Sequence, residues 1–419
     1  MLTILKLAAQ SAWNRRLTLS MTLISIALSI TLLLGVERLR QDARAGFEQS
    51  ISGTDLIIGA RTSPVQLMLY AVFRLGGATN NIGWDSFKKL QEQPAVAWAV
   101  PLSLGDSHRG YPVLATDASY FEHFHYGENR ALVVTQGKII ADVFDVVIGA
   151  EVADALHYQL GDRVVLTHGM VQAGPAHDDK PFTVTGILAR TGTPVDRTLH
   201  ITLAGMEAIH LNWAGGAPLT SLQIPAEYVR KFDLTPKTIT AVLVGLKNRA
   251  AVFKMQRFVS EYHDEPLLAV MPGVALADLW QVVGVVEKVL LAVSAMVVAV
   301  GLCGLMAALL AGLNERRREL AILRAVGARP LHVFCLLLVE GVSVSFLGVL
   351  TGIVFLWLLT LAASGWVQAH FGLRVSLHFL SLIELQWVGM VLAVSVVASL
   401  VPGWRAYRLS LADGLIPRI

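Results

Sequence analysis

Four long apolar segments constrain the fold of this chain more than any other feature of its sequence. Residues 17–35 form a stretch of 19 residues without a charged side chain, and residues 289–313 form a second one of 25. Residues 341–370 contain no Asp, Glu, Lys or Arg, and the apolar run reaches back through Glu340 to residue 331. Each segment is long enough to cross roughly 30 Å of hydrocarbon as a helix. The sequence therefore predicts four transmembrane helices, at 17–36, 289–313, 331–369 and 385–404.

The distribution of basic residues predicts how these helices are oriented. Lys6, Arg15 and Arg16 precede the first helix, five arginines lie at 314–330, and the short loop 370–384 has only Arg374. Cytoplasmic loops carry an excess of Lys and Arg. We therefore expect an amphipathic helix at 1–16, the 314–330 segment and the tail 405–419 in the cytoplasm, with 37–288 outside. This asymmetry accounts for the net charge of +3 without nucleic acid as a partner.

Residues 37–288 are long enough to form a separate domain. We expect stalk helices at both ends and two strand–helix–strand patterns, at about 50–105 and 238–272, that pack into one split α/β subdomain. Between them, about 106–237 is expected to be mostly β, including 145–156 and 197–210. Both cysteines, Cys303 and Cys335, fall in or beside membrane helices, so no disulfide holds this domain together. The predicted fold class is an α-helical membrane protein with four transmembrane helices plus a large α+β extracytoplasmic domain inserted between helices 1 and 2.

Three apolar or intramembrane features have more than one interpretation. The stretch "QLMLYAVFRL" at 66–75 is too short to span a bilayer. It is either a buried core helix or a helix that touches the outer leaflet or a partner. Glu340 lies inside the third membrane helix, where a carboxylate is a functional candidate; we favour a structural pairing with an arginine. Gly348 and Gly352 form a GxxxG pattern, which favours close helix packing and leaves dimerisation as the alternative.

The sequence lacks the motifs of common catalytic sites. No Walker A, HExxH or GxSxG pattern is present. We therefore expect no enzyme activity and no cofactor in this chain. His168, His177 and Asp178 have side chains of the kind that bind metal, without the spacing of a known zinc motif. The favoured interpretation is solvated loop histidines and no metal; a metal site is the alternative.

The segment "NERRRELAILRAVGARP" at 314–330 has the features of a short amphipathic helix. Asn314 is a suitable N-cap, Gly327 a terminator, and Pro330 blocks continuation. Leu320 and Leu323 would form an apolar side of this helix, and charged residues would form the opposite side. A plain positive-inside loop explains the arginines but not the alternation of Glu315 and Glu319 with apolar residues, which is typical of a docking surface.

This segment resembles the signature of FtsX/MacB-type ABC transporter permeases, a superfamily that includes lipoprotein-release and macrolide-exporter proteins. The ending "PGWRAYRLSLADGL" is similar to the same family's closing pattern, and "LKLAAQSAWNRRLTLSMTLISIALSI" to its first helices. The outer segments "VIGAEVADALHYQLGDRVVL" and "FTVTGIL" resemble the periplasmic domains of the lipoprotein-release members. The resemblance covers essentially the whole chain.

The resemblance implies a function and a set of partners. Two permease copies, or one and a close paralogue, would pair with two copies of a separate ABC ATPase, which binds ATP and Mg because this chain has no fused nucleotide-binding domain. The implied location is a bacterial inner membrane, with both termini cytoplasmic and the large domain periplasmic. There the chain would contact the lipid bilayer and a periplasmic or outer-membrane partner. The residues that would couple to the ATPase are Glu315, Arg316, Arg317, Arg318, Glu319, Arg324 and Gly327.

Two functions are compatible with this resemblance. The first is a permease subunit that transmits ATP-driven motion to its periplasmic domain, for export, extraction or envelope handling of a substrate. That substrate is left open among a lipoprotein, a lipid, a peptide and a small molecule. The second is an FtsX-like transmembrane signalling scaffold that regulates a cell-envelope partner.

Overall fold

The computed structural model describes residues 15–169, 174–214, 217–218, 224–315, 327–371 and 379–408. The chain divides into two compact units. We call Met1–Ala43 together with Gly284–Ile419 the helical unit, and Arg44–Val283 the sheet unit. The boundary between them falls within two long helices.

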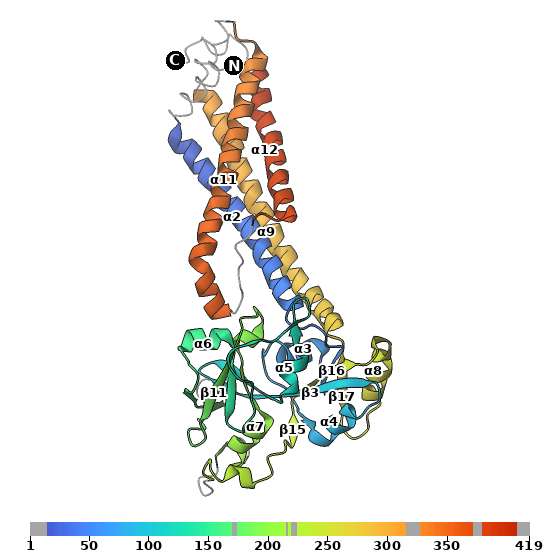
Figure 1. Ribbon diagram of the computed structural model, residues 1–419. Helices are drawn as coiled ribbons and strands as arrows, with labels where there is room; N and C mark the ends of the chain where they lie inside the picture. The colour runs from blue at the N-terminus through green and yellow to red at the C-terminus, as the bar shows by residue number, and fades with distance from the viewer. Residues whose placement is uncertain are drawn as a thin grey trace. The chain divides into compact units, whose positions relative to one another are not determined.

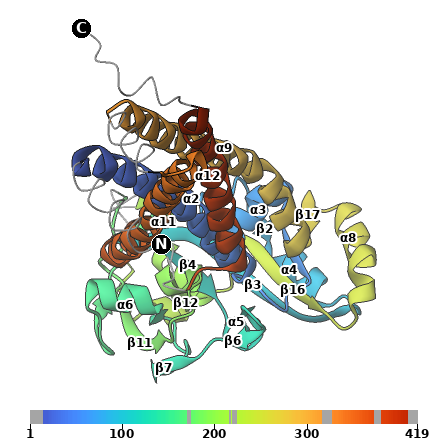
Figure 2. The same cartoon turned by 90° about the horizontal axis from the view of Figure 1, so that it is seen from above.

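The helical unit is built on four long helices, which Figure 2 views close to end-on. They are α2 (Arg16–Glu48), α9 (Pro272–Glu315), α11 (Pro330–Phe371) and α12 (Leu382–Arg408). All four are long and apolar enough to cross a membrane. At 1.5 Å per residue, α2 with 33 residues and α9 with 44 residues measure about 50 and about 66 Å. Both are therefore longer than the roughly 30 Å of a bilayer core.

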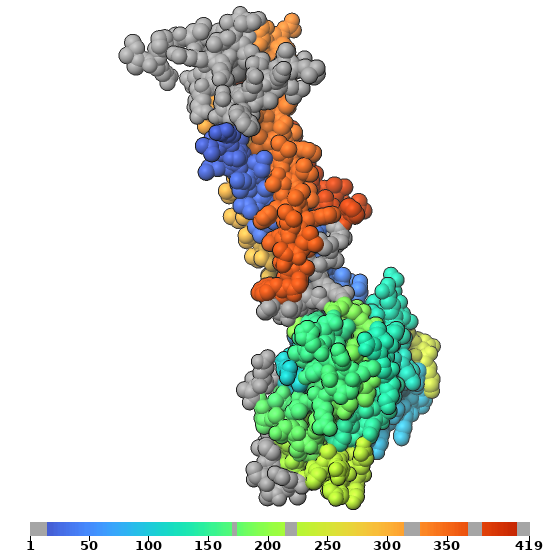
Figure 3. Space-filling view, turned by 60° about the vertical axis from the view of Figure 1, so that its left-hand side comes forward, coloured from blue at the N-terminus to red at the C-terminus, as the bar shows by residue number. Residues whose placement is uncertain are grey.

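α11 packs against α2 (Figures 1 and 3). Two glycines of α11 lie at this contact. A Cβ built on Gly352 would lie 2.6 Å from the carbonyl oxygen of Ala27, and one on Gly348 would lie 2.8 Å from Ile26 Cγ2. The Thr31 hydroxyl donates to the Gly352 carbonyl at 3.0 Å. The GxxxG pattern thus packs two helices of the same chain.

Two buried ion pairs lie among the described residues of the helical unit. Arg15 donates to Glu340, so the expected pairing of this carboxylate with an arginine is confirmed. Arg38 and Glu384 lie 3.2 Å apart with 1% and 0% of their side chains exposed. Glu384 also accepts from the Ser381 amide at 2.7 Å, while the Ser381 hydroxyl accepts from the Glu384 amide at 3.2 Å. This reciprocal capping box starts α12 at Leu382, whereas the predicted membrane span starts at 385.

The sheet unit contains one large sheet with the strand order β17-β1-β16-β3-β4-β12-β8-β11-β7, and two short strands, β10 and β9, pair with β3 and β11. These strands are β1 (Leu56–Ala60), β3 (Val96–His108), β4 (Tyr111–Thr116), β7 (Val134–Gly137), β8 (Asp145–Ile148), β9 (Arg163–Val164), β10 (Thr167–His168), β11 (Phe182–Leu188), β12 (Leu199–Thr202), β16 (Ala241–Leu246) and β17 (Leu267–Val270). Shorter strands are β2 (Ile82–Gly83), β5 (His125–Tyr126), β6 (Arg130–Ala131), β13 (Trp213–Ala214), β14 (Ala217–Pro218) and β15 (Thr238–Ile239).

Helices cover both faces of this sheet. They are α3 (Pro64–Ala71), α4 (Trp84–Gln91), α5 (Ser119–His123), α6 (Ala150–Leu156), α7 (Leu203–His210) and α8 (Val252–Ser260), with 3-10 turns η1 (Pro194–Arg197), η2 (Val229–Lys231) and η3 (Arg249–Ala251). Alternate residues of β1 belong to two different cores: Leu56 and Ile58 join the core that contains α4 and α8, and Ile57 joins the core that contains α3. Since both faces are covered, all five residues of β1 are buried.

The two predicted strand–helix–strand patterns meet in this sheet. β1 and β3 come from the first and β16 and β17 from the second, and they are neighbours in the order β17-β1-β16-β3. The stretch 66–75 is a core segment, because Leu67, Met68 and Tyr70 of α3 are 2% exposed or less. The expected boundary between the split subdomain and the insertion, at residues 105 and 106, falls inside β3.

Two segments expected to be β are half helical. In 145–156, β8 ends at Ile148 and α6 begins at Ala150; in 197–210, β12 ends at Thr202 and α7 begins at Leu203. The apolar runs continue across both junctions, so hydrophobicity alone does not mark the change. The first junction has room only for a glycine, because a Cβ at Gly149 would lie 2.2 Å from the Val195 carbonyl oxygen. Thr202 caps α7 by accepting from the Gly205 amide.

Candidate functional site

A bulge in β3 positions an acidic side chain in the interior of the sheet unit. Leu104 pairs with Leu114 of β4 and Ser107 with Pro112, so the register shifts between Leu104 and Ser107. Such bulges bend a strand and redirect its side chains. The shifted segment contains Asp106, whose side chain is 0% exposed.

Two histidines approach Asp106, one from β10 and one from the residues that are hydrogen-bonded to β10 and its neighbours. His168 of β10 is the cross-strand partner of Asp106 in β3. Residues 175–177 lie beside β10, because the His168 amide donates to the Pro175 carbonyl at 2.9 Å and the His177 amide donates to the Leu166 carbonyl at 2.8 Å. These backbone hydrogen bonds place the rings of His168 and His177 next to the same β3 side chain, that of Asp106.

The third histidine, His210, is the last residue of α7. Its Nδ1 lies 2.8 Å from the Met206 carbonyl oxygen. A carbonyl only accepts, so Nδ1 carries the proton and the neutral ring keeps a free lone pair on Nε2. That atom is the one directed at Asp106 and the other histidines.

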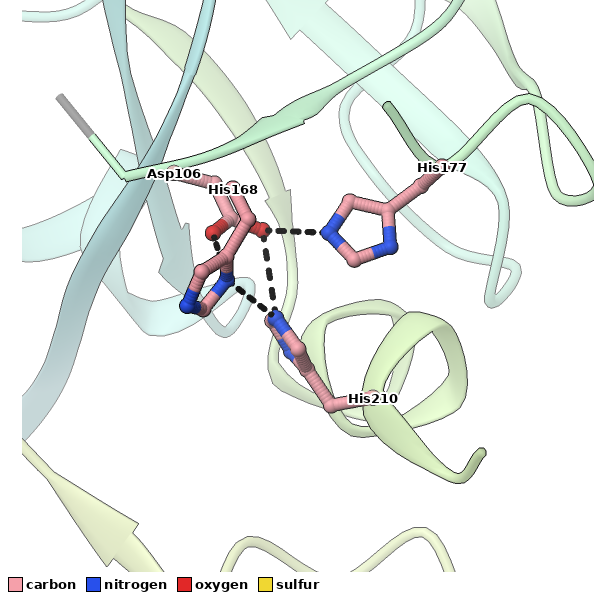
Figure 4. Close-up of side chains that lie close together, drawn as sticks. All are labelled: Asp106, His168, His177 and His210. Carbon is pink, nitrogen blue, oxygen red and sulfur yellow. Dashed lines mark hydrogen bonds and ion pairs between the residues drawn. The ribbon is translucent and has the colours of Figure 1, made fainter. Parts of the chain in front are cut away.

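The four side chains converge on one point (Figure 4). His168 Nδ1 lies 3.1 Å from His210 Nε2 and 3.2 Å from Asp106 Oδ1. Asp106 Oδ2 lies 3.6 Å from His210 Nε2 and 3.7 Å from His177 Nε2. One donor atom from each residue lies within 4.8 Å of the others. We call Asp106, His168, His177 and His210 the Asp–His cluster.

The surroundings disfavour charge on Asp106, His177 and His210. Burial raises the pKa of Asp106 to about 7, an effect that the Gly169 amide partly offsets. Burial, followed by the nearby His210 and His168, lowers the pKa of His177 to about 3. Burial also lowers the pKa of His210 to about 4, although the hydrogen bond that His210 donates to the Met206 carbonyl acts in the opposite direction. Among the described residues, neither Asp106 oxygen nor either ring nitrogen of His177 makes a hydrogen bond of normal geometry.

Trp213 closes one side of the Asp–His cluster. Its ring centroid lies 4.4 Å from that of His177, 4.8 Å from that of His168 and 5.6 Å from that of His210. The fully buried Lys180 is held by Asp179 and by the Asn212 side-chain oxygen, the latter at 3.0 Å. The chain thus provides an aromatic wall and an already paired cation beside the cluster.

The structure brings together only some of the residues that the sequence analysis selected as metal candidates. His168 and His177 are in the cluster, but Asp178 is exposed and not part of it. Asp178 lies in the turn that follows His177. Asp106 and His210 were missed, because they lie far from the other two in the sequence. The one local signal for Asp106 is the glycine before it, which is typical of a bulge within a strand.

The predicted coupling residues lie mostly outside the described residues. These are Arg316, Arg317, Arg318, Glu319 and Arg324. Glu315 is the last residue of α9. Gly327 has φ +104°, a backbone conformation that favours glycine, and α11 begins three residues later at Pro330.

Comparison with known proteins identifies the family. Residues 19–253, more than half of the chain, match the MacB-like periplasmic core domain. Residues 291–411 match the FtsX-like permease C-terminal family. The chain therefore belongs to the FtsX/MacB-type ABC transporter permeases, which are transmembrane transport proteins.

Individual relatives carry the name of a lipoprotein-releasing system transmembrane protein, LolC. The LolC of Neisseria meningitidis is 24% identical over 66% of this chain and 66% of the relative. The LolC of Xylella fastidiosa is 21% identical over 94% of this chain and 92% of the relative. The chain thus spans just under two thirds of the Neisseria protein and most of the Xylella protein.

Two solved structures are similar to part of the chain. The periplasmic region of MacB from Actinobacillus actinomycetemcomitans has a TM-score of 0.33 and 12% identity, covering 55% of this chain and 94% of that one. The extracellular domain of the transporter YknZ from Gram-positive bacteria has a TM-score of 0.30 and 12% identity, covering 52% and 99%.

Proposed function

We propose that this chain is the transmembrane subunit of an ABC transporter that transmits motion from a separate cytoplasmic ATPase to the sheet unit. In this proposal the sheet unit is inserted between membrane helices α2 and α9 on the periplasmic side of a bacterial inner membrane. ATP binding in the partner drives export, extraction or envelope handling of a substrate. The membrane helices transmit force, and the substrate need not pass between them.

The length of the helices that lead into the sheet unit is the observation that carries the proposal. α2 and α9 exceed the thickness of a bilayer core by about 20 Å or more, and each is one unbroken helix of 33 or 44 residues. A continuous helix is a rigid element. Two such helices are suited to carrying a displacement out of the membrane.

The names of the relatives favour one substrate class. The proteins named LolC belong to a lipoprotein-releasing system, so a lipid-modified protein is the first substrate class to test. The signalling alternative predicts a different outcome, because a scaffold would bind an envelope partner without an ATP-dependent change in any substrate.

The segment 314–330 provides the direct test of ATPase coupling. The chain is purified from native membranes in mild detergent, and the co-purifying ATPase is identified by mass spectrometry and assayed for ATP hydrolysis. Glu315→Lys combined with Glu319→Lys reverses two charges at the proposed contact. Desolvated interfacial charges contribute on the order of a few kcal/mol, so we expect co-purification to fall at least about tenfold.

A matched variant controls for the change in net charge. Glu122 and Glu128 are exposed in the sheet unit, and their double replacement by lysine alters the net charge equally. We expect this control to retain the ATPase. Undiminished binding and hydrolysis in the Glu315/Glu319 variant would contradict the coupling role of this segment.

A further inference from the structure

We propose that the Asp–His cluster binds one divalent transition-metal ion of the Zn²⁺ type through Asp106, His168, His177 and His210. This site lies within the sheet unit and is independent of the transport function proposed above. Its ligands come from β3, β10, the segment after β10 and the end of α7. A bound ion would therefore cross-link four separate parts of the sheet unit.

The spacing of the donor atoms fits tetrahedral coordination. Zinc bonds to nitrogen and oxygen of about 2.0–2.1 Å place tetrahedral ligands about 3.3 Å apart. Among Asp106 Oδ2 and the three histidine nitrogens, the distances are 3.1 Å from His168 to His210, and 3.6 and 3.7 Å from Asp106 Oδ2 to His210 and His177. The other carboxylate oxygen, Asp106 Oδ1, lies 3.2 Å from His168 Nδ1. The largest separation of any two donors is 4.8 Å or less, so small side-chain movements complete the coordination.

The donor set matches the ion. Imidazole nitrogen suits zinc and related metals, and one carboxylate with three neutral imidazoles gives a net charge of −1 toward a dication. The proton on His210 Nδ1 is held by the Met206 carbonyl at 2.8 Å, the arrangement by which metal-binding histidines fix their orientation. Four protein ligands without an open position are typical of a structural rather than a catalytic zinc site.

The polar atoms of the cluster point to a ligand rather than to a closed hydrogen-bond network. Asp106 and His177 are both 0% exposed, and a buried polar group without a partner destabilises the folded protein. The Asp106 oxygens and the His177 nitrogens lack hydrogen bonds of normal geometry among the described residues. A cation coordinated by these atoms would satisfy Asp106 and one nitrogen of His177 together.

The test uses the full-length protein, purified in detergent with chelator and then dialysed against buffered zinc or cobalt. We expect one zinc ion per chain by elemental analysis. We also expect cobalt to give the intense visible absorption of a tetrahedral site, a measurement that needs no variant. Asp106→Asn and His177→Ala should each weaken zinc binding at least about 100-fold, since loss even of outer-shell partners costs 10–100-fold.

His263 provides the matched control, because it is an exposed histidine of the sheet unit outside the cluster. His263→Ala should bind zinc like the parent. Gel filtration and circular dichroism identify any variant that fails to fold, and His210→Gln, at a partly exposed ligand, then replaces it. A folded parent that binds no zinc or cobalt, an octahedral cobalt spectrum, or zinc binding that survives both Asp106→Asn and His177→Ala would overturn the proposal.

Discussion

At the scale of single residues, the sheet unit holds an imidazole that its surroundings keep neutral. His200 is 0% exposed and packs against Tyr120 and Phe121, with ring centroids 5.3 and 5.7 Å away. Its Nδ1 lies 3.3 Å from the Val147 carbonyl. Burial, with a smaller contribution from Arg74, lowers the pKa of His200 to about 3. A group of this kind links the stability of the fold to pH.

The sign of this linkage gives a prediction for acid stability. Below about pH 6.5 the unfolded chain protonates this histidine while the folded protein does not, so His200 removes stability as pH falls. At pH 4.5 the difference amounts to about 2–3 kcal/mol. We expect the thermal midpoint of the detergent-solubilised protein to fall less between pH 7 and 4.5 in His200→Phe than in the parent. Equal falls in both proteins would contradict the prediction.

The ion pair between Arg38 and Glu384 gives a second prediction at this scale. Removing one partner of a buried pair leaves the other charge uncompensated, at a cost of about 3–5 kcal/mol. Glu384→Gln should therefore lower the thermal midpoint strongly. The double variant Arg38→Met with Glu384→Gln should recover part of the loss, because it removes both charges. A double variant that is less stable than Glu384→Gln would show that the pair is not the main interaction of these residues.

Residue patterns predicted part of the candidate site and not the rest. His168 and His177 lie 9 positions apart in the sequence, and backbone hydrogen bonds to Pro175 and Leu166 hold them close together. Residues so near in the sequence can be paired without knowledge of the fold. Asp106 lies in β3, and its direction depends on the bulge between Leu104 and Ser107. His210 lies 42 residues beyond His168. Such long-range convergence depends on strand order, which periodicity does not determine.

At the scale of elements, the contact of α2 with α11 is set by glycine rather than by large side chains. Gly352 leaves room for the Ala27 carbonyl, and Thr31 donates to the Gly352 carbonyl at 3.0 Å. Large side chains of α11, such as Leu350, Val354 and Leu358, are 50–58% exposed. This division of small packed and large exposed residues is typical of helices that pack together in lipid.

A pair of glycine substitutions tests this packing. A Cβ on Gly352 would lie 2.6 Å from backbone oxygen, whereas a Cβ on Gly365 of the same helix has nothing within 4 Å. Gly352→Ala should destabilise the protein by about 1–3 kcal/mol, the usual cost of overpacking. Gly365→Ala should be neutral or stabilising, because alanine favours helix. The measurement is the thermal midpoint in detergent, and equal midpoints for the two variants would contradict the packing.

Elements were predicted best where one physical signal dominates. The four long helices follow from uninterrupted apolar runs, and the strands of the split α/β part follow from short apolar runs between turn residues. The helices α6 and α7 were missed because each continues the apolar run of a preceding strand. Their starts depend on the close approach at Gly149 and on the cap at Thr202, which are details of tertiary structure and capping.

For the molecule as a whole, the proposed function requires that the chain cross the membrane four times with both termini inside. Reporter enzymes that are active only outside the cytoplasm check this arrangement. A fusion after Pro101 in the sheet unit should be active, and a fusion after Arg329 should be inactive. The reverse pattern would contradict the orientation derived from the basic residues.

In the proposed function, ATP bound in a cytoplasmic partner changes the sheet unit on the other side of the membrane. Hydrogen exchange of the permease–ATPase complex in lipid nanodiscs, followed by mass spectrometry with and without ATP, measures this change. We expect ATP to alter exchange within residues 44–283, and Glu315→Lys with Glu319→Lys to abolish this response while leaving the ATP-free pattern unchanged. Identical exchange of the sheet unit with and without ATP, in a complex that binds and hydrolyses ATP, would show that the chain does not transmit motion across the membrane.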